Sequence, residues 1–244
     1  MSGTMETGEI LGLLDLTLLD READEAALEG LCNLANKHRP AAVCVFPEHA
    51  PLVGSMLDDG IALAVVAGGF PEGSSSPECI ADDVRAAVSS GAEEVDCVLE
   101  PRDEGDFPGE AELAKLIAMR EGSQGCLLKV IVEAPLLGER GLRAVTRMAL
   151  ATGADFVKTC TGKRGICSDE AARIIAYEIS RHCLAFDGEP GLKLSGGVSS
   201  KGDAERLIGI VSEQDQSISG PARLRIGSSA LLGELIDYGG LGRN

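Results

Sequence analysis

Eight short apolar segments, each followed by a longer segment with helical spacing or a loop leading into one, predict a (β/α)8 TIM barrel. Continuous runs of Val, Ile and Leu are typical of parallel strands that crossover helices cover on both faces. A length of 244 residues is ordinary for one such barrel, so we expect residues 1–244 to form a single domain. A doubly wound open sheet is the structural alternative, because it uses the same alternation of strands and helices.

The elements follow one another at regular intervals along the chain. The predicted strands are Leu11–Leu14, Ala41–Phe46, Ile61–Val66, Glu94–Leu99, Cys126–Val132, Asp155–Thr159, Gly191–Leu194 and Arg223–Ile226. The clearest predicted helices are Glu22–Asn36, Glu78–Ser89, Leu137–Ala151 and Asp169–His182. Gly60, Gly91 and Gly153 each stand just before a predicted strand, where a glycine commonly ends the preceding helix.

The charge and the aromatic content disfavour two classes of partner. The formal net charge is -17, which repels phosphate polymers and anionic membranes. Aromatic residues make up only 3% of the chain and Trp is absent, which disfavours a surface that stacks single-stranded nucleic acid. No apolar run approaches the ~20 residues of a membrane helix. We therefore expect no nucleic-acid or membrane partner.

The eight cysteines indicate a reducing compartment. They are spread from Cys32 to Cys183 with no C-x-x-C pair and no Cys/His spacing typical of zinc. Several lie in apolar runs, where a thiol packs as a small hydrophobic group. The segment 1–8 has no basic region followed by an apolar one, so we expect no signal peptide and a cytoplasmic protein.

Three lysines stand inside predicted strands, where a charged side chain is costly unless it is paired or neutral. Lys129, Lys158 and Lys193 fall on the fifth, sixth and seventh strands. Since alternate strand residues point into a barrel, these side chains could converge there. Burial and neighbouring positive charge both lower the pKa of a lysine, which would give a free amine able to attack carbonyls. The alternative is a set of internal ion pairs with Asp96 and Glu133.

Other polar residues in strand contexts extend this candidate site. Asp15 and Asp96 lie in apolar runs, so a buried carboxylate could hold a water and move protons, or act as a structural counter-ion. Cys44 lies between two valines and is consistent with simple core packing. None of the three histidines falls in a strand run, so neither a histidine base nor a metal centre is favoured, and we expect no metal or cofactor.

Three glycine-rich segments follow late strands: Thr161-Gly162-Lys163, Ser195-Gly196-Gly197 and Gly227-Ser228-Ser229. Glycine lets the backbone approach an anion closely, and barrels commonly bind phosphate with the loops after the seventh and eighth strands. No G-x-G-x-x-G sequence opens a helix and no Walker A motif is present, which disfavours dinucleotide and ATP binding.

The segment from Ala154 to Lys163, ADFVKTCTGK, resembles the Schiff-base strand of the deoxyribose-phosphate aldolase family. Further segments match the family in order along nearly the whole chain, from about Leu13 to Leu232. They are LDLT at 14–17, AVCVFP at 42–47, FPEG at 70–73, EVD at 94–96, LKVIVE at 128–133, KLSGG at 193–197 and RIGSS at 225–229.

The resemblance implies a class I aldolase that joins acetaldehyde to glyceraldehyde 3-phosphate reversibly, through 2-deoxyribose 5-phosphate and without a metal. Lys158 would form the Schiff base, Lys193 would promote its deprotonation, and Asp96 would position the catalytic water and relay protons. The implied substrate-binding residues are Asp15, Cys44, Thr161, Gly162, Lys163, Gly196, Gly197, Gly227, Ser228 and Ser229. The partners would be small aldehydes and sugar phosphates, and a homodimer is an expectation that no interface in the sequence fixes.

Some positions depart from the family pattern, chiefly around the phosphate. Ser199 stands where an Arg is common, Ala230 where a second Ser is common, and Glu72 where a His is frequent. Lys201 is a nearby substitute for the missing charge, whereas Tyr238 does not match the mobile tyrosine tail of some members. Two other functions stay open: a Schiff-base barrel aldolase with a different acceptor, and a sugar-phosphate-binding barrel without catalysis.

Overall fold

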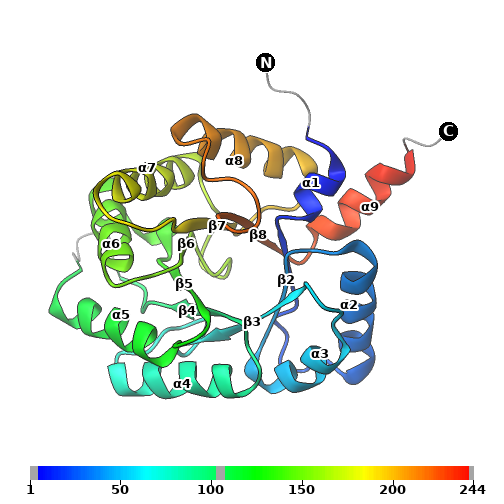
Figure 1. Cartoon of the computed structure of the whole chain (residues 1–244), viewed down its shortest axis with the longest axis horizontal. Helices are drawn as coiled ribbons and strands as arrows, with labels where there is room; N and C mark the ends of the chain where they lie inside the picture. The colour runs from blue at the N-terminus through cyan, green and yellow to red at the C-terminus, as the bar shows by residue number, and fades with distance from the viewer. Residues whose placement is uncertain (1–4, 103–107, 242–244) are drawn as a thin grey trace.

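The eight strands form one closed barrel in which every neighbouring pair is parallel. The computed structural model describes residues 5–102 and 108–241 (Figure 1). The strands are β1 (Leu14–Thr17), β2 (Ala42–Val45), β3 (Ala62–Ala67), β4 (Glu94–Val98), β5 (Leu127–Ile131), β6 (Phe156–Lys158), β7 (Gly191–Ser195) and β8 (Leu224–Ser228). Pairing of Leu14 with Ile226 and of Asp15 with Gly227 closes β1 onto β8. The predicted TIM barrel is confirmed, and the open sheet is excluded.

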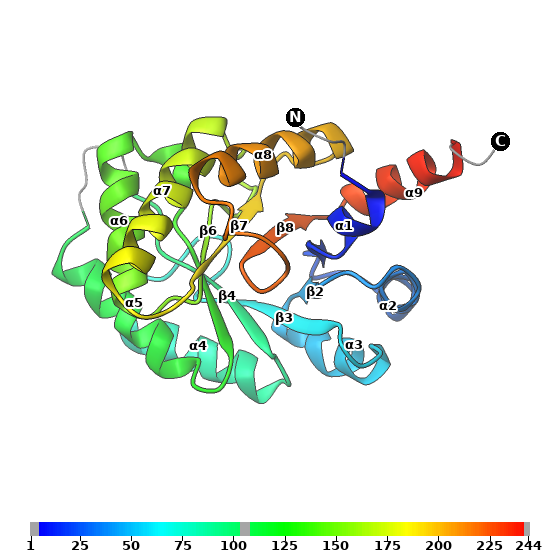
Figure 2. The ribbon, with the colours of Figure 1, turned by 45° about the horizontal axis from the view of Figure 1, so that its top comes forward.

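Helices surround the barrel and one follows each strand, as Figures 1 and 2 show. They are α1 (Thr7–Leu11), α2 (Glu25–His38), α3 (Ala50–Met56), α4 (Pro77–Ser89), α5 (Glu110–Gly122), α6 (Glu139–Ala151), α7 (Asp169–Ala185), α8 (Lys201–Gln214) and α9 (Leu231–Leu241). Two short 3-10 helices, η1 (Pro47–His49) and η2 (Ala134–Leu136), precede α3 and α6. Gly60, Gly91 and Gly153 have φ values of 87°, 100° and 89°, the left-handed conformation expected of helix-ending glycines.

The first strand was predicted three residues too early. Residues Thr7–Leu11 form the short helix α1, which packs beside α8 and α9, and β1 begins only at Leu14. The prediction stopped where the apolar run meets Asp15, but burial of that carboxylate among cations lets the strand continue through it. Helix α2 likewise begins later than predicted, because the Asp24 side chain accepts a hydrogen bond from the Ala27 amide at 2.9 Å and caps it.

The interior of the barrel is apolar on one side and charged on the other. The main hydrophobic core lies between the strands and the surrounding helices. A second, smaller cluster includes Ala42 and Cys44 of β2, Ala64 and Val66 of β3 and Phe70 just beyond β3. Strands β4 to β8, together with β1, instead direct buried charged side chains inward. This asymmetry makes one half of the barrel a polar site inside a hydrophobic wall.

All eight cysteines are free thiols, and Cys44, Cys97 and Cys160 are fully buried. Over residues 5–102 and 108–241, no helix has both the length and the apolar character needed to cross a bilayer. Across the same ranges, no group of three His, Cys, Asp or Glu side chains is arranged to hold a metal ion.

Candidate active site

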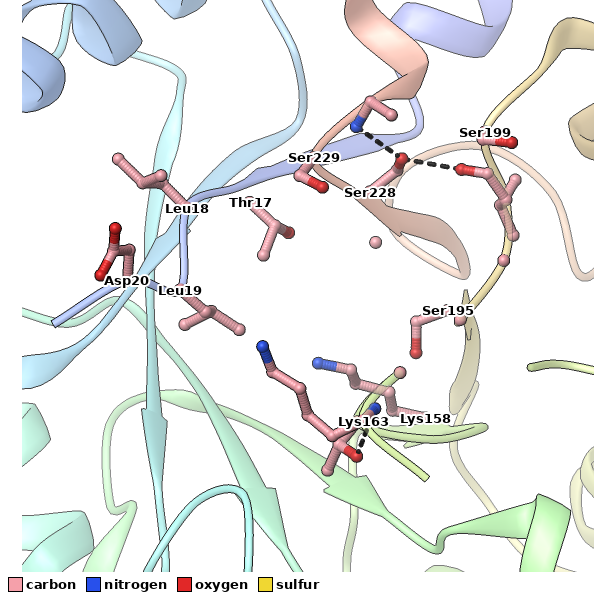
Figure 3. Close-up of a pocket in the computed structure, with 17 residues that line it drawn as sticks. Thr17, Leu18, Leu19, Asp20, Lys158, Lys163, Ser195, Ser199, Ser228 and Ser229 are labelled. Atoms are coloured by element: carbon pink, nitrogen blue, oxygen red, sulfur yellow. Dashed lines mark hydrogen bonds between the residues drawn. The ribbon is translucent and has the colours of Figure 1, made fainter. Parts of the chain in front are cut away.

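A cavity of about 410 Å³ opens at the carboxyl ends of the strands (Figure 3). Its wall is made by the ends of four strands and the residues that follow them: 17–20 at β1, 158 and 161–163 at β6, 195–199 at β7 and 227–230 at β8. These segments are far apart in sequence, but the closed barrel brings β1 next to β8 and so completes the wall. The three predicted glycine-rich segments therefore meet at one opening.

Beneath the cavity, the three strand lysines converge on two buried aspartates. Asp96 Oδ2 accepts hydrogen bonds from both Lys158 Nζ at 2.7 Å and Lys193 Nζ at 2.6 Å. Lys193 Nζ also lies 2.5 Å from Asp15 Oδ2, and Lys129 Nζ lies 2.9 Å from the same oxygen. The predicted convergence is confirmed, and the ion pairing that the alternative interpretation expected of Asp96 is present as well.

Only one of the three lysines reaches the cavity. Lys129 and Lys193 are 0% exposed and do not line it, whereas Lys158 is 3% exposed and forms part of the wall. In Figure 3 the amines of Lys158 and Lys163 both extend into the space opposite Leu19. Lys158 is therefore the interior amine that a bound molecule would touch.

The pKa shifts of the fully buried lysines are opposite to the direction predicted from the sequence. Burial alone lowers the pKa of Lys193, but the carboxylates of Asp15 and Asp96 outweigh it and raise the value. The same balance, with Glu94 added, raises the pKa of Lys129 well above normal. Burial raises the pKa of Asp96, yet the three lysines hold it well below its usual range. The prediction of a lowered pKa weighed burial and neighbouring cations, whereas the alternative of internal ion pairs with Asp96 agrees with the direction observed for Lys129 and Lys193.

One oxygen of Asp96 has no hydrogen bond from the described part of the chain. Its Oδ1 lies 3.1 Å from Lys129 Nζ, within ion-pair distance, but the contact lacks hydrogen-bond geometry. A fully buried carboxylate oxygen in this position retains a lone pair that can accept a proton or a hydrogen bond from a water molecule. Lys129 thus offsets the charge of Asp96 without occupying that lone pair.

A lower layer of charges, which the sequence analysis missed, lies below these residues. Glu94 of β4 is 2.5 Å from Lys129 Nζ and accepts a hydrogen bond from Arg225 Nη2 of β8 at 2.7 Å. Arg225 Nη1 also donates to Asp15 Oδ1 at 2.8 Å. The signals were present in the sequence: Glu94 is two residues before Asp96, so both point to the same side of the strand, and Arg225 interrupts an apolar run.

Glu133 does not pair with the lysines, as the ion-pair interpretation expected. Its buried carboxylate accepts hydrogen bonds from the Thr161 amide at 2.8 Å, the Thr161 hydroxyl at 2.7 Å and Arg164 Nη1 at 3.1 Å. Arg164 also donates to the Pro71 carbonyl at 2.6 Å. Glu133 has a φ of 51°, an uncommon conformation for a residue with a side chain. It therefore fixes the loop that follows Lys158.

The glycines of the late loops are required by close contacts. Gly196 has a φ of 91°, and a Cβ there would lie 2.5 Å from Cys160 Sγ. A Cβ on Gly227 would lie 3.0 Å from Lys193 Cε, so this glycine also leaves room for the buried lysine. Gly162 and Gly197 have φ values of 77° and 76°. The loops after β6 and β7 thus reach the cavity wall through backbone that only glycine adopts easily, whereas Gly227 of β8 is required by space alone.

The serine hydroxyls on the wall differ in what they contact. Ser228 Oγ donates to the Val198 carbonyl at 2.7 Å and accepts from the Ala230 and Leu231 amides, so it joins two loops. Ser199 and Ser229 are exposed on the wall. Among the lining residues the charged groups are Lys158, Lys163 and Asp20, and none is an arginine.

Three further sequence predictions find a different place. Asp15 and Cys44 are fully buried below the cavity and do not line it, and burial raises the pKa of the Cys44 thiol. Lys201 is also off the wall, with its amine 3.7 Å from Glu205 Oε1. The replacement of the missing phosphate arginine by Lys201 therefore stays a prediction, with Lys201 placed outside the residues that line the cavity. Tyr238 lies within α9, and its side chain is outside the described part of the structure.

Comparison with known proteins agrees with this geometry. Residues 11–232 match the model of the DeoC/LacD family aldolases. A deoxyribose-phosphate aldolase of Exiguobacterium sibiricum is 34% identical over 203 residues, which cover 82% of this chain and 88% of the relative. The structure of deoxyribose phosphate aldolase from Aeropyrum pernix superimposes with a TM-score of 0.78 at 24% identity, covering 97% of this chain and 93% of the other. A protein of Toxoplasma gondii ME49 superimposes with a TM-score of 0.84 at 20% identity, covering 95% and 93%.

Proposed function

Because this chain belongs to the DeoC/LacD aldolase family, we propose that it cleaves 2-deoxyribose 5-phosphate reversibly into glyceraldehyde 3-phosphate and acetaldehyde through a Schiff base on Lys158. One observation supports this assignment above the others. Lys158 is the interior lysine on the cavity wall, and a hydrogen bond of 2.7 Å ties its amine to a buried aspartate. An amine held in this way is preorganised to attack a carbonyl that enters the cavity.

The charges of the barrel interior also favour Lys158 as the amine that becomes neutral. Four cations, namely Lys129, Lys158, Lys193 and Arg225, lie among three carboxylates, namely Asp15, Glu94 and Asp96. Lys129 contacts all three carboxylates, and Lys193 and Arg225 contact two each. Of these three carboxylates, and within the described residues, Lys158 contacts Asp96 alone. Loss of one proton from Lys158 would balance the interior and break the fewest ion pairs.

In the cleavage direction, the Lys158 amine attacks the aldehyde carbon of the open-chain sugar and water leaves, which forms the imine. A base then takes the proton of the 3-hydroxyl and the bond between C2 and C3 breaks. Its electrons flow into the protonated imine to give a neutral enamine, while C3 becomes the aldehyde carbon of glyceraldehyde 3-phosphate, which leaves. Protonation of the enamine and hydrolysis release acetaldehyde and the free lysine. Asp96 Oδ1, which has no hydrogen bond from described residues, would hold the water that carries these protons.

The remaining wall would bind the acceptor half of the substrate. Thr161 and Lys163 would contact the sugar. Lys163 would place a second cation, besides Lys158, beside the sugar. The phosphate would rest on backbone amides of the Gly196–Gly197 and Gly227 loops and on the hydroxyl of Ser229. Backbone donors can hold a phosphate without arginine, though less tightly than a charge-assisted pair.

A related aldolase activity on an unphosphorylated acceptor is the second candidate. Ser199 and Asp20 favour this activity. They give the cavity wall a hydroxyl and a carboxylate, whereas a phosphate group would be bound more tightly by cationic side chains. A binding protein without catalysis is disfavoured, because it has no need of an amine on the cavity wall above a charged cluster.

The test is a cleavage assay on 2-deoxyribose 5-phosphate and on 2-deoxyribose, with wild-type protein and Lys158→Arg. The proposal expects cleavage by the wild type and background rates for Lys158→Arg, which keeps the charge but has no amine able to form an imine. Preference for the unphosphorylated sugar would favour the second candidate. More than a trace of cleavage by homogeneous Lys158→Arg would exclude Lys158 as the nucleophile.

A further inference from the structure

We propose that Glu94 and Arg225, buried at the base of the charged interior, are positioning residues that set the pH range in which Lys158 forms its Schiff base. They would act by fixing the net charge around the catalytic amine, without touching the substrate. This inference rests on the proposed function, and its test separates the two.

The two side chains form a hydrogen-bonded pair across the barrel. Arg225 Nη2 donates to Glu94 Oε1 at 2.7 Å, and Arg225 Nη1 lies 3.2 Å from Glu94 Oε2. Their side chains are 7% and 3% exposed, and neither lines the cavity. Contact with a substrate is therefore excluded, and any influence on the reaction has to pass through the electrostatics of the interior.

Two short chains of ion pairs connect this pair to Lys158. Glu94 contacts Lys129 at 2.5 Å, Lys129 lies 3.1 Å from Asp96, and Asp96 accepts from Lys158. Arg225 donates to Asp15, which lies 2.5 Å from Lys193, and Lys193 donates to the same oxygen of Asp96 as Lys158 does. Both chains end on Asp96, so a change of charge at the base reaches the catalytic amine by two routes.

In the described part of the chain, seven charged side chains face this interior, and the amine of Lys163 extends into the cavity beside that of Lys158 (Figure 3). By strand, the seven are Asp15 of β1, Glu94 and Asp96 of β4, Lys129 of β5, Lys158 of β6, Lys193 of β7 and Arg225 of β8. Strand β2 contributes the thiol of Cys44, whose pKa burial raises, and β3 contributes only Ala64 and Val66. Since Cys44 stays uncharged, Glu94 and Arg225 supply one of the three negative and one of the four positive charges.

Neutralising Glu94 and neutralising Arg225 should shift the pH at which the free amine of Lys158 forms in opposite directions. Glu94→Gln adds one net positive charge to the interior and should move the alkaline rise of imine formation to lower pH. Arg225→Met removes one positive charge and should move the rise to higher pH. For a unit charge roughly 8–10 Å away at an effective dielectric constant of about 20, each shift is about one pH unit. The double variant leaves the net charge unchanged and should restore the wild-type profile.

The experiment measures the rate of borohydride trapping with acetaldehyde between pH 5 and 9 for the wild type, both single variants and the double variant. Acetaldehyde alone is the probe, because it requires the amine but no acceptor subsite. Circular dichroism establishes that each variant is folded, since breaking a buried ion pair by removing one partner is strongly destabilising. If only one single variant folds, it is compared with the double variant, from which it differs by one charge. Glu170→Gln and Arg173→Met, which neutralise an exposed ion pair of α7, are the matched controls.

Opposite shifts in the two single variants, with the double variant near the wild type, are the expected result. Equal loss of trapping at every pH, without a shift, would assign the pair a purely structural role and overturn the inference. Absence of trapping in the wild type itself would overturn the proposed function instead.

Discussion

Replacement of Glu133 by Gln should separate the two halves of the reaction. The Glu133 carboxylate receives three hydrogen bonds from the loop after β6, two of them from Thr161 on the cavity wall. A glutamine at this position keeps one acceptor oxygen, but its NH2 group would face a hydrogen-bond donor of Thr161 or Arg164 and could not accept from it. A hydrogen bond to a charged group contributes about 1.5–3 kcal/mol, so a loss near 2–3 kcal/mol is expected, or roughly 30- to 150-fold. Lys158 lies in β6 before this loop and should keep its position.

The assay combines steady-state cleavage of 2-deoxyribose 5-phosphate with borohydride trapping of acetaldehyde. We expect Glu133→Gln to raise the KM for the sugar phosphate by the factor above and to leave the trapping rate within about twofold. Glu139→Gln, which changes an exposed ion pair with Arg143 on α6, is the control and should alter neither quantity. An unchanged KM, or a trapping rate that falls in parallel with cleavage, would refute the view that Glu133 orders the acceptor loop.

Three other predictions concern phosphate, metal and acid. Ser199→Arg should lower the KM for 2-deoxyribose 5-phosphate and leave that for 2-deoxyribose nearly unchanged, because only the phosphate gains a charge-assisted contact; an equal effect on both sugars would place Ser199 away from the phosphate. EDTA should not reduce cleavage, because the imine serves as the electron sink; loss of activity that zinc restores would contradict this. Lys129, Lys193 and Arg225 overcome burial and hold the pKa of Asp15 below its ordinary value of 3.8, so the stability it provides is present above that pH and is lost as the pH falls below it. Thermal unfolding of Asp15→Asn should therefore show lower stability than the wild type at pH 7 and a smaller further loss below pH 4; matching curves would contradict the ion pairing of Asp15.

The barrel could be predicted because its signals are local. Buried parallel strands require continuous apolar runs, and three lysines inside such runs are costly enough to indicate a site. The convergence of Lys129, Lys158 and Lys193 followed from strand alternation alone. The bounds of β1 show the limit of such local signals, since the apolar run Leu11–Leu14 predicts a strand that the structure instead places at Leu14–Thr17, through Asp15.

Apart from Asp96, which the ion-pair interpretation names, the partners of these lysines could not be predicted because they depend on the register between strands. Asp96 of β4 is in register with Lys129 of β5, and Lys158 of β6 is in register with Lys193 of β7. Arg225 of β8 is in turn in register with Lys193. The direction of the pKa shift follows from how many carboxylates surround each amine, which the spacing of lysines does not contain. Glu133 was assigned to the wrong partner for a similar reason. Its left-handed backbone turns the carboxylate toward the loop after β6.

The central claim is that Lys158 forms the covalent intermediate, and reductive trapping tests it most directly. Wild-type protein is incubated with acetaldehyde and borohydride, digested and analysed by peptide mass spectrometry. We expect one added ethyl group, about 28 Da, on the peptide that contains Lys158, with Lys129 and Lys193 unmodified because both are fully buried. Lys158→Arg should show no such adduct. An adduct on another interior lysine, or none in the wild type, would contradict the account.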